Sequence, residues 1–450
     1  MRQVGTRTIL LVAVLAVCLS IGSSASAQQA GVAVDAQGVL KMNVVNDPGG
    51  RLMQQRIAAA KSTLPPEITK PTAMRMISLN RLADVIGSRN GVPTDEMRYL
   101  AGLIRVKYVF YYPDTKDIVI AGPAEGWVTN PVGRVVGMTS GRPTIQLQDL
   151  VVALRAYPPG KKGTGLIGCS IDPTQEGLAE MQRFLRSIGT RATPAHTQFI
   201  VNGLRTSLGL QDVRIDGVPP ETHFAQVMVE ADYRMKLIGI GLERPPIRLV
   251  SWVDRANPAQ VSRNAMQRWY FVPDYHCVRI SDDGLAMELV GDGVKLIGED
   301  EMVTAGGQRQ ASGQKSAASQ AFVTSFTKKY SELAERSPVY AELRNLIDLA
   351  VASAHIQKQG YCQKAGWDLG LLGNEQEFAV ETYHAPKQVA TAVNAIWKGH
   401  RLMTPIGGGV SIHARKALES SNTLPDEKGK VAELRKEIKL NLDKGQWWWN

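Results

Sequence analysis

Three segments of the sequence place turn residues between runs of β-branched and aromatic residues, and this pattern predicts antiparallel sheet. Residues 32–45 (VAVDAQGVLKMNVV) alternate around an Asp-Ala-Gln-Gly turn, and residues 105–122 carry a loop at 113–116. Residues 276–298 contain two Asp-Gly pairs, whose glycines can adopt the positive φ that tight hairpins need. We therefore expect two hairpins, followed by a meander over residues 276–298.

Helical patterns alternate with these strands. Residues 166–189 (LIGCSIDPTQEGLAEMQRFLRSIG) are typical of a short strand and then a helix, with Asp172 and Pro173 at the helix start. Residues 322–360 contain two helical stretches, and Ser337-Pro338 restarts the second, so a helical hairpin is expected. The predicted fold class is α+β: a mixed strand and helix body with antiparallel hairpins, followed by a mainly helical C-terminal region.

Composition divides the chain into regions. Residues 306–320 (GGQRQASGQKSAASQ) are small and polar, which is typical of a linker or an exposed loop. We predict a mixed α/β region over residues 28–305, with a division into two subdomains near residues 140–165 left open. A mainly helical region with a tryptophan tail is predicted over residues 321–450. A chain of this length is expected to form two or three domains.

Residues 223–242 (HFAQVMVEADYRMKLIGIGL) hold two acids and two bases within seven positions, and two geometries compete for them. In a strand, the four charged residues would share one face and resemble a polar site. In a helix, apolar residues recur at three- and four-residue steps, and each acid precedes a base by four residues. We favour the helix, in which Glu230–Arg234 and Asp232–Lys236 are structural ion pairs worth about a few tenths of a kcal/mol each.

The first 27 residues have the parts of a secretory signal peptide. Two arginines form a basic start, an apolar run follows over residues 9–18, and small residues stand at 25–27, where a signal peptidase would cut. Because the apolar run is too short to cross a bilayer comfortably, we predict cleavage between Ala27 and Gln28. The mature protein is then secreted, periplasmic or in the cell envelope; the alternative is an uncleaved membrane anchor.

The charge of the chain is mildly positive. The formal net charge is +10, and it is +8 without residues 1–27, which contain two arginines and no acid. This bias is compatible with an anionic envelope polymer as a partner, and another exported protein is the alternative partner. No run of lysine and arginine with interleaved aromatic residues points to nucleic acid. No other stretch is long and apolar enough to predict a transmembrane span in the mature chain.

Three longer phrases of the sequence together carry a family resemblance. They are residues 111–127 (YYPDTKDIVIAGPAEGW), 229–243 (VEADYRMKLIGIGLE) and 268–301 (RWYFVPDYHCVRISDDGLAMELVGDGVKLIGEDE). The chain resembles a family of secreted planctomycete proteins known as domain of unknown function 1598, from about Arg105 through the helical hairpin. The resemblance implies an exported protein, and it implies no activity, cofactor or catalytic residue.

Candidate reactive groups are few. Cys169 lies at the end of a strand before a helix, where a helix dipole can lower the pKa of a thiol, and His196 or His223 could serve as its base. No protease or esterase signature surrounds Cys169, so a buried small residue is the competing interpretation. Cys277 and Cys362 complete the mature thiols, as three buried thiols or as one disulfide and a free thiol.

Metal, cofactor and phosphate sites are not predicted. The seven histidines are scattered, and no Cys-x-x-Cys or His-x-x-x-His pair occurs, so no metal site and no cofactor are expected. The stretch 405–416 (PIGGGVSIHARK) invites a phosphate interpretation, but a flexible turn before a strand is favoured.

The C-terminal tail ends in Trp447, Trp448 and Trp449, and three exposed indoles would be an apolar liability in a soluble protein. Either they dock onto the body of the protein, which we favour, or they form a surface anchor that faces a partner or a lipid headgroup layer.

Three functional hypotheses follow. The first is a non-catalytic, envelope-associated structural or binding protein, because the charges can pair and no reactive cluster converges in the sequence. The second is a secreted hydrolase with a site near Cys169. The third is a membrane-surface protein held by its C-terminal tail.

Overall fold

The computed structural model describes residues 28–189, 193–256, 265–303, 309–311, 316–394, 396–398, 401–403, 407–440 and 442–450. The predicted signal peptide lies outside the described residues, and so does part of the predicted linker at 306–320.

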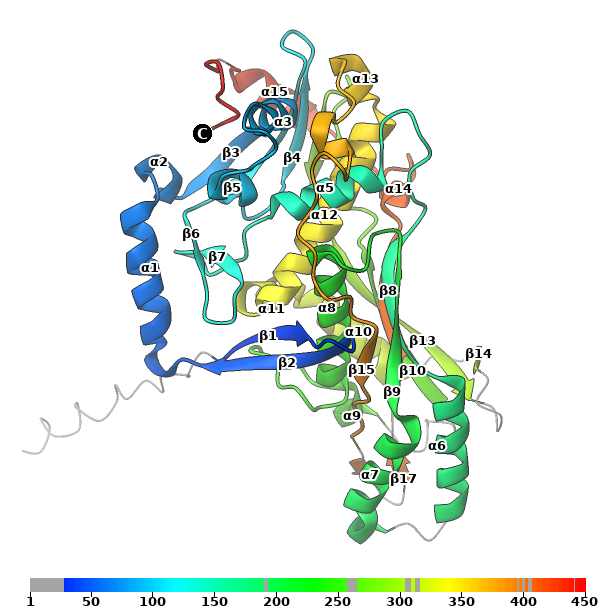
Figure 1. The fold of residues 1–450 in the computed structure, drawn as a ribbon. Coiled ribbons are helices and arrows are strands. Elements are labelled where there is room, and N and C mark those ends of the chain that lie inside the picture. Colours follow the sequence, from blue (N-terminus) through cyan, green and yellow to red (C-terminus); the bar gives the residue numbers. More distant parts are fainter. Residues whose placement is uncertain are drawn as a thin grey trace, which may run out of the picture.

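Two mixed sheets carry most of the described strands (Figure 1). The first sheet has the order β1-β2-β15-β9-β8-β18-β10-β13-β14 among these residues. Its strands are β1 (Gln28–Val34), β2 (Val39–Asn46), β8 (Ile167–Pro173), β9 (Leu210–Asp216), β10 (Ala265–Pro273), β13 (Val294–Val303), β14 (Arg309–Ala311), β15 (Gln388–Ala390) and β18 (Gly407–Ile412).

The second sheet has the order β19-β11-β12-β4-β5-β3-β20. Its strands are β3 (Thr72–Ser78), β4 (Tyr108–Tyr112), β5 (Asp117–Ala124), β11 (Val278–Ile280), β12 (Ala286–Leu289), β19 (Leu424–Pro425) and β20 (Trp448–Trp449). Two small hairpins join β6 (Trp127–Thr129) to β7 (Val135–Gly137), and β16 (Ile396–Lys398) to β17 (Arg401–Met403).

Helices fill the space between and around the sheets. They are α1 (Arg51–Thr63), α2 (Pro66–Thr69), α3 (Leu79–Ser88), α4 (Asp95–Arg98), α5 (Leu147–Ala156), α6 (Gln175–Ile188), α7 (Thr197–Leu208), α8 (His223–Gly239), α9 (Trp252–Arg255), α10 (Ala317–Lys328), α11 (Tyr330–Arg336), α12 (Pro338–Lys358), α13 (Tyr361–Ala365), α14 (Ala414–Ala417) and α15 (Lys430–Glu437). None of the described helices combines the length and the apolar character that crossing a membrane requires.

The core of the molecule is built on α12 and α8. Every residue of α12 from Val339 to Ile356 is buried. α8 packs against β8 and β18 on one side and against α12 on the other, and α5 also contacts both helices (Figure 1). α8 is enclosed on most of its circumference, and it buries charged positions that would face water on a surface helix.

The α+β fold class is confirmed, and so are two local predictions. β1 and β2 form the expected hairpin, and Gly38 takes a φ of 84° in its turn. β4 and β5 form the second hairpin around residues 113–116. Both helical stretches of the predicted helical hairpin are present: the first is split at Lys329 into α10 and α11, and α12 restarts at Pro338 and contacts α11.

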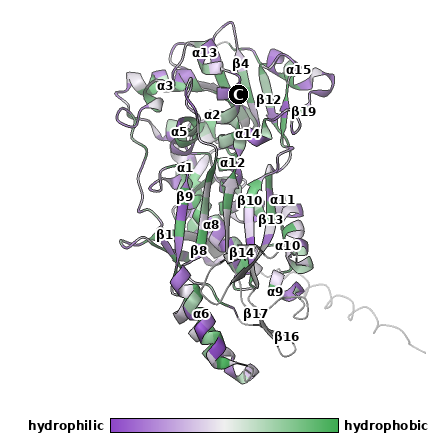
Figure 2. Cartoon of the chain, turned by 90° about the vertical axis from the view of Figure 1, so that its right-hand side faces the viewer, coloured by the Kyte–Doolittle hydropathy of each residue, from purple (hydrophilic) through white to green (hydrophobic). Residues whose placement is uncertain are grey.

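The helix predicted after Asp172 begins slightly later than expected. Pro173 is still part of β8, and the Thr174 side chain caps α6 by accepting a hydrogen bond from the Gly177 amide. Figure 2 shows hydrophobic and hydrophilic residues alternating along α6. Its apolar stripe packs with α7 in a small separate cluster.

The predicted meander is wrong in its second half. β11 and β12 form a hairpin in the second sheet, but β13 leaves that sheet and pairs along its whole length with β10 in the first sheet. Gly291 and Gly293 have φ angles of 69° and 68°, which turn the chain between the two sheets. An Asp-Gly pair therefore marked a turn here without marking a hairpin.

The glycine-rich stretch at 405–416 is not a flexible turn in its described part. Gly407 to Gly409 begin β18, which lies between β8 and β10 in the first sheet. A Cβ atom added at Gly408 would lie 2.1 Å from the Trp269 carbonyl oxygen, and one at Gly409 would lie 2.1 Å from that of Cys169. These glycines are present because neighbouring backbones approach too closely for a side chain.

The region after residue 320 is helical only in part. β15 and β18 lie inside the first sheet, and β19 and β20 form the two edges of the second. The C-terminal half thus supplies strands to sheets that the N-terminal half begins. The predicted borders of the regions stay a prediction.

The tryptophan tail lies on the body of the protein. β20 pairs antiparallel with β3, and the Trp447 side chain is buried in the main core. The Trp448 ring lies 4.8 Å from the Arg75 guanidinium carbon, and its indole N–H donates to Glu96. These contacts give Trp447 and Trp448 internal partners, as docking requires.

Candidate functional site

The stretch at 223–242 forms α8, and its two ion pairs are present. Thr222 caps the helix by accepting from the Ala225 amide. Arg234 lies 3.4 Å from a Glu230 oxygen, and Lys236 lies 2.9 Å from an Asp232 oxygen, each one turn apart.

The expectation that each pair is worth only a few tenths of a kcal/mol is wrong, because all four charged residues are buried. Glu230, Asp232, Arg234 and Lys236 are between 0 and 8 % exposed. Desolvation of such groups costs several kcal/mol, so each charge needs a partner and hydrogen bonds in a fixed geometry. Removing one partner of such a pair therefore costs more stability than removing one partner of a solvent-exposed helix pair.

Asp232 and Lys236 face the first sheet. The Lys236 ammonium donates to the Ile171 carbonyl oxygen of β8 at 3.0 Å. Burial raises the pKa of Asp232 to about 6, although the neighbouring Lys236 acts in the opposite direction. Through Lys236, this pair connects α8 to β8, in the middle of the first sheet.

Glu230 and Arg234 belong to a longer chain of charges on the opposite side of α8. Arg134, from the loop between β6 and β7, binds both Glu230 and Glu342 of α12. Arg234 also binds Glu243 at 2.7 Å. We call these five residues the buried ion network; it sets three carboxylates against two guanidinium groups.

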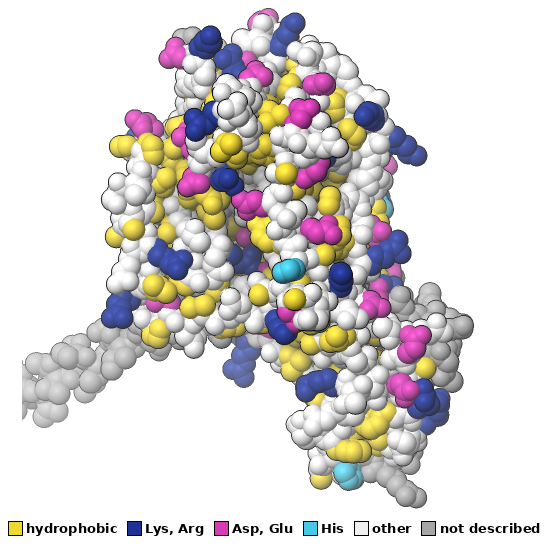
Figure 3. Space-filling model, viewed as in Figure 1, with side chains coloured by type: hydrophobic (Ala, Val, Ile, Leu, Met, Phe, Trp, Pro, Cys, Tyr) yellow, Lys and Arg dark blue, Asp and Glu magenta, His cyan; other side chains and the backbone are white. Residues whose placement is uncertain are grey.

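A cleft of about 710 Å³ opens beside this network. β1 contributes residues 31–34 to its walls, the β6–β7 loop and the start of β7 contribute 132–135, α8 contributes residues between His223 and Glu230, and residues 381–384 close the remaining side. Figure 3 shows this face hollowed between its left-hand lobe and the central column of the molecule. It is the larger of the two pockets described here.

His223 stands in the cleft wall at the first position of α8. Its Nδ1 atom lies 2.9 Å from an Asp149 oxygen on α5, and the Asp149 side chain is 6 % exposed. Burial lowers the pKa of His223, but the charge and hydrogen bond of Asp149, with help from Glu342, outweigh it and raise the pKa to about 8. A protonated His223 also adds positive charge beside a network that has an excess of carboxylate.

A chain of amide groups leads from His223 to the cleft rim. The Gln146 Nε2 atom lies 3.4 Å from His223 Nε2, and the Gln146 oxygen accepts from Gln148 at 2.6 Å. Gln148 also donates to the Tyr383 hydroxyl at 3.1 Å, which in turn donates to Glu381 at 3.2 Å. Burial raises the pKa of Tyr383 to about 12, so this hydroxyl remains neutral.

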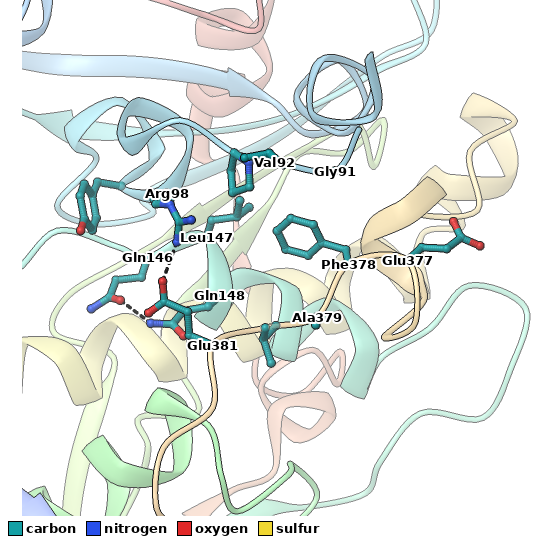
Figure 4. Close-up of a pocket in the computed structure, with 13 residues that line it drawn as sticks. Gly91, Val92, Arg98, Gln146, Leu147, Gln148, Glu377, Phe378, Ala379 and Glu381 are labelled. Atoms are coloured by element: carbon teal, nitrogen blue, oxygen red, sulfur yellow. Dashed lines mark hydrogen bonds and ion pairs between the residues drawn. The ribbon is translucent and has the colours of Figure 1, made fainter. Parts of the chain in front are cut away.

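A second pocket of about 360 Å³ adjoins the cleft and shares Tyr99, Gln146 and Glu381 with it. Figure 4 shows Val92, Leu147 and Phe378 turned toward this space, with Arg98 paired to Glu381. That ion pair has a length of 2.6 Å. The two pockets are neighbours, and we call them together the groove; the part at Val92 is lined by both apolar and polar side chains.

The other sequence candidates do not join this groove. Cys169 is buried in β8, and burial, with Asp232 nearby, raises its pKa well above the ordinary value. His196 is exposed before α7 and contacts Thr193. Within the described part of the chain, no hydrogen bond or ring contact joins Cys169 to His196 or His223. A buried thiol with a raised pKa is a poor nucleophile.

The thiols and acids give no further site. Cys169, Cys277 and Cys362 are free and buried. Among the described residues, no group of three or more His, Cys, Asp or Glu side chains has an arrangement that could hold a metal ion.

Sequence reasoning missed Asp149, Gln146, Arg134 and Glu342. Asp149 carried a usable signal, because it is the only acid in a helix, residues 147–156, that is otherwise apolar except for Gln148 and Arg155. Arg134 carried no such signal. It lies in an ordinary turn, and its partners Glu230 and Glu342 are 96 and 208 residues away in the sequence.

The fold and the groove define an α+β protein with a polar cleft over a buried helix. Residues 169–252 match the model of a family described as protein of unknown function (DUF1598). The matched segment runs from β8 to α9 and includes α8 with His223 and Glu230, whereas Asp149, Arg134 and Glu342 lie outside it. Comparison with curated proteins and with solved structures finds no match.

The raised pKa of His223 predicts a pH dependence of stability. A shift from 6.5 to about 8 corresponds to about 2 kcal/mol, fully present below pH 6.5 and lost as the pH rises through 8. The stability lost in Asp149→Asn should therefore be larger at pH 6 than at pH 9, as measured by urea unfolding. Asp84→Asn, on an exposed position of α3, controls for loss of a carboxylate. Equal losses for Asp149→Asn at both pH values would contradict the assignment.

Proposed function

We propose that this is an exported, non-catalytic binding protein of the cell envelope, cut before Gln28, whose ligand occupies the groove beside α8. Export is supported by the pattern of the first 27 residues and by the resemblance to a family of secreted planctomycete proteins. The observation that carries the binding role is the groove itself. Its two pockets, of about 710 and 360 Å³, share three lining residues and bring polar and apolar groups together.

The state of the charged groups favours binding over catalysis. Arg134 occupies both Glu230 and Glu342, and Arg98 occupies Glu381. These carboxylates are therefore held by cations and are not free to accept a proton from a substrate. Groups held in this way shape and orient a ligand without reacting with it.

The binding role is tested by comparing how the wild-type protein and a variant with an obstructed groove retain one envelope component. Gln226 lines the cleft from α8, so Gln226→Trp should obstruct it. We expect the wild-type protein to retain one specific polymer or protein from an envelope extract, and Gln226→Trp to lose it. Gln198→Trp, at an exposed position of α7, is the matched control. Equal retention by Gln226→Trp would place the binding elsewhere. N-terminal sequencing of the mature protein tests the predicted cut.

One observation favours a secreted hydrolase as the second candidate. His223 lines the larger pocket and is held by the buried Asp149, and a carboxylate that holds Nδ1 leaves Nε2 as the atom that can take a proton from water. The base would then be His223, at a place distinct from Cys169. A screen with chromogenic ester, amide and glycoside substrates tests this role. Turnover by the wild type that His223→Gln abolishes would replace the non-catalytic proposal.

A further inference from the structure

The edge of the first sheet at β1 is open in the described structure. β1 is the terminal strand of the sheet and pairs only with β2. The Asp35 amide donates to the Val39 carbonyl, so Asp35 and Val39 are a hydrogen-bonded pair. Because such pairs alternate along an antiparallel ladder, Val32 and Val34 belong to the non-hydrogen-bonded positions. Their N–H and C=O groups point away from β2.

This open edge faces the cleft. Four consecutive residues, 31–34, line the cleft, whereas a strand that presents one face would contribute only alternate residues. Among the described contacts, no backbone hydrogen bond reaches Val32 or Val34 from outside the β1–β2 ladder. On the opposite wall, the Tyr383 amide already donates to Glu221 at 2.7 Å. The cleft therefore has one wall with free backbone groups and one wall that is fixed in place.

The free groups select a particular kind of occupant. They repeat every second residue, about 7 Å apart, and alternate donor with acceptor, which is the spacing of an extended peptide backbone. The smaller pocket adds a second requirement: Val92 is 60 % exposed there, and Leu147 and Phe378 face the same space. These three residues offer a contact surface for an apolar side chain.

The charges of the groove set the third requirement. Arg134 and Arg98, the two arginines in its walls, are paired with Glu230 and Glu381 respectively. The walls therefore offer no unpaired arginine to an acidic ligand, and an uncharged segment is the best match.

We infer that the groove binds an extended, uncharged peptide segment of another exported protein, which adds as a strand to the free edge of β1 and places one apolar side chain in the Val92–Phe378 pocket. The inference rests on the proposed binding function and names its ligand class. Main-chain hydrogen bonds to Val32 and Val34 supply affinity, and the pocket supplies selectivity.

The experiment is a selection of heptapeptides from a random phage-displayed library on the immobilised mature protein, residues 28–450. We expect enrichment of uncharged sequences with one aliphatic or aromatic residue at a constant position. Val32→Pro removes an outward N–H without removing a β1–β2 hydrogen bond, and proline is tolerated at such edge positions. It should weaken binding of the selected peptides at least tenfold, and Gln226→Trp should do the same.

N-methylation of the selected peptide provides an independent readout that requires no protein variant. A methyl group on each amide in turn should weaken binding at every second position, because alternate amides face β1. Loss without this two-residue period, or enriched peptides that bind Val32→Pro and Gln226→Trp normally, would overturn the inference. Failure to enrich any peptide would also overturn it. The proposed function would survive that result if the wild type, but not Gln226→Trp, still retained an envelope component.

Discussion

Replacing Arg134 by methionine is expected to lower the free energy of unfolding by about 3 to 5 kcal/mol. The arginine joins Glu230 of α8 to Glu342 of α12, and its side chain is 9 % exposed. Burial alone would lower the pKa of Arg134, but the two carboxylates raise it, so the guanidinium stays charged. Methionine keeps much of the stem volume and removes the charge. Two buried carboxylates then lose their shared partner.

Chemical denaturation measures this loss, and two further variants separate charge from packing. Arg183→Met removes the partner of Glu180 in an exposed pair, with side chains 62 and 49 % exposed, and should cost less than about 1 kcal/mol. Adding Glu342→Gln to Arg134→Met should recover part of the stability, because one stranded carboxylate disappears. A cost for Arg134→Met as small as that for Arg183→Met would show that the network does not hold the two helices together.

Replacing Gly409 by alanine is expected to cost more than about 3 kcal/mol and to leave little folded protein. The new Cβ would lie 2.1 Å from the carbonyl oxygen of Cys169, a distance at which the neighbouring backbone must move. β18 has a paired strand on each side, so a displacement there disturbs both ladders.

The control for this variant is Gly165→Ala. An added Cβ at Gly165 meets no atom within 4 Å, and the residue is not among the glycines with positive φ. It should change stability by less than about 1 kcal/mol. Soluble yield and thermal unfolding of both variants decide the matter, and a stable Gly409→Ala protein would mean that β18 is not fixed between β8 and β10.

Much of the local structure could be predicted because its causes are local. The turn around Gly38 and the loop at 113–116 are specified by a few adjacent residues, and each joins strands that pair with each other. The same holds for α8, whose apolar spacing and one-turn charge pairs favour a helix over a strand. Local patterns could not predict which elements surround α8. A pattern of mixed charges is typical of a surface helix. Glu230 is buried instead, and the arginine that pairs with it, Arg134, lies 96 residues away in the sequence.

Predictions failed where the chain changes sheets. The Asp292-Gly293 turn resembles a hairpin turn, yet β13 follows it into the other sheet to pair with β10. The three glycines of β18 resemble a loop, since nothing in a sequence shows that two backbones will approach a strand from both sides. The candidate site failed for a related reason: His223 was considered as a base for Cys169, but its partner is Asp149 on a helix 74 residues earlier.

The sequence by itself determined the hairpins, the helices with their one-turn charge pairs and the α+β class, because hydrogen bonds and side-chain periodicity act over a few residues. Only the tertiary structure decided that α8 is enclosed, that Asp149 meets His223 and that β1 borders a cleft with its free edge. These features depend on contacts between segments far apart in the chain. Such contacts form because burying apolar surface brings whole elements together, and the polar partners follow from that packing.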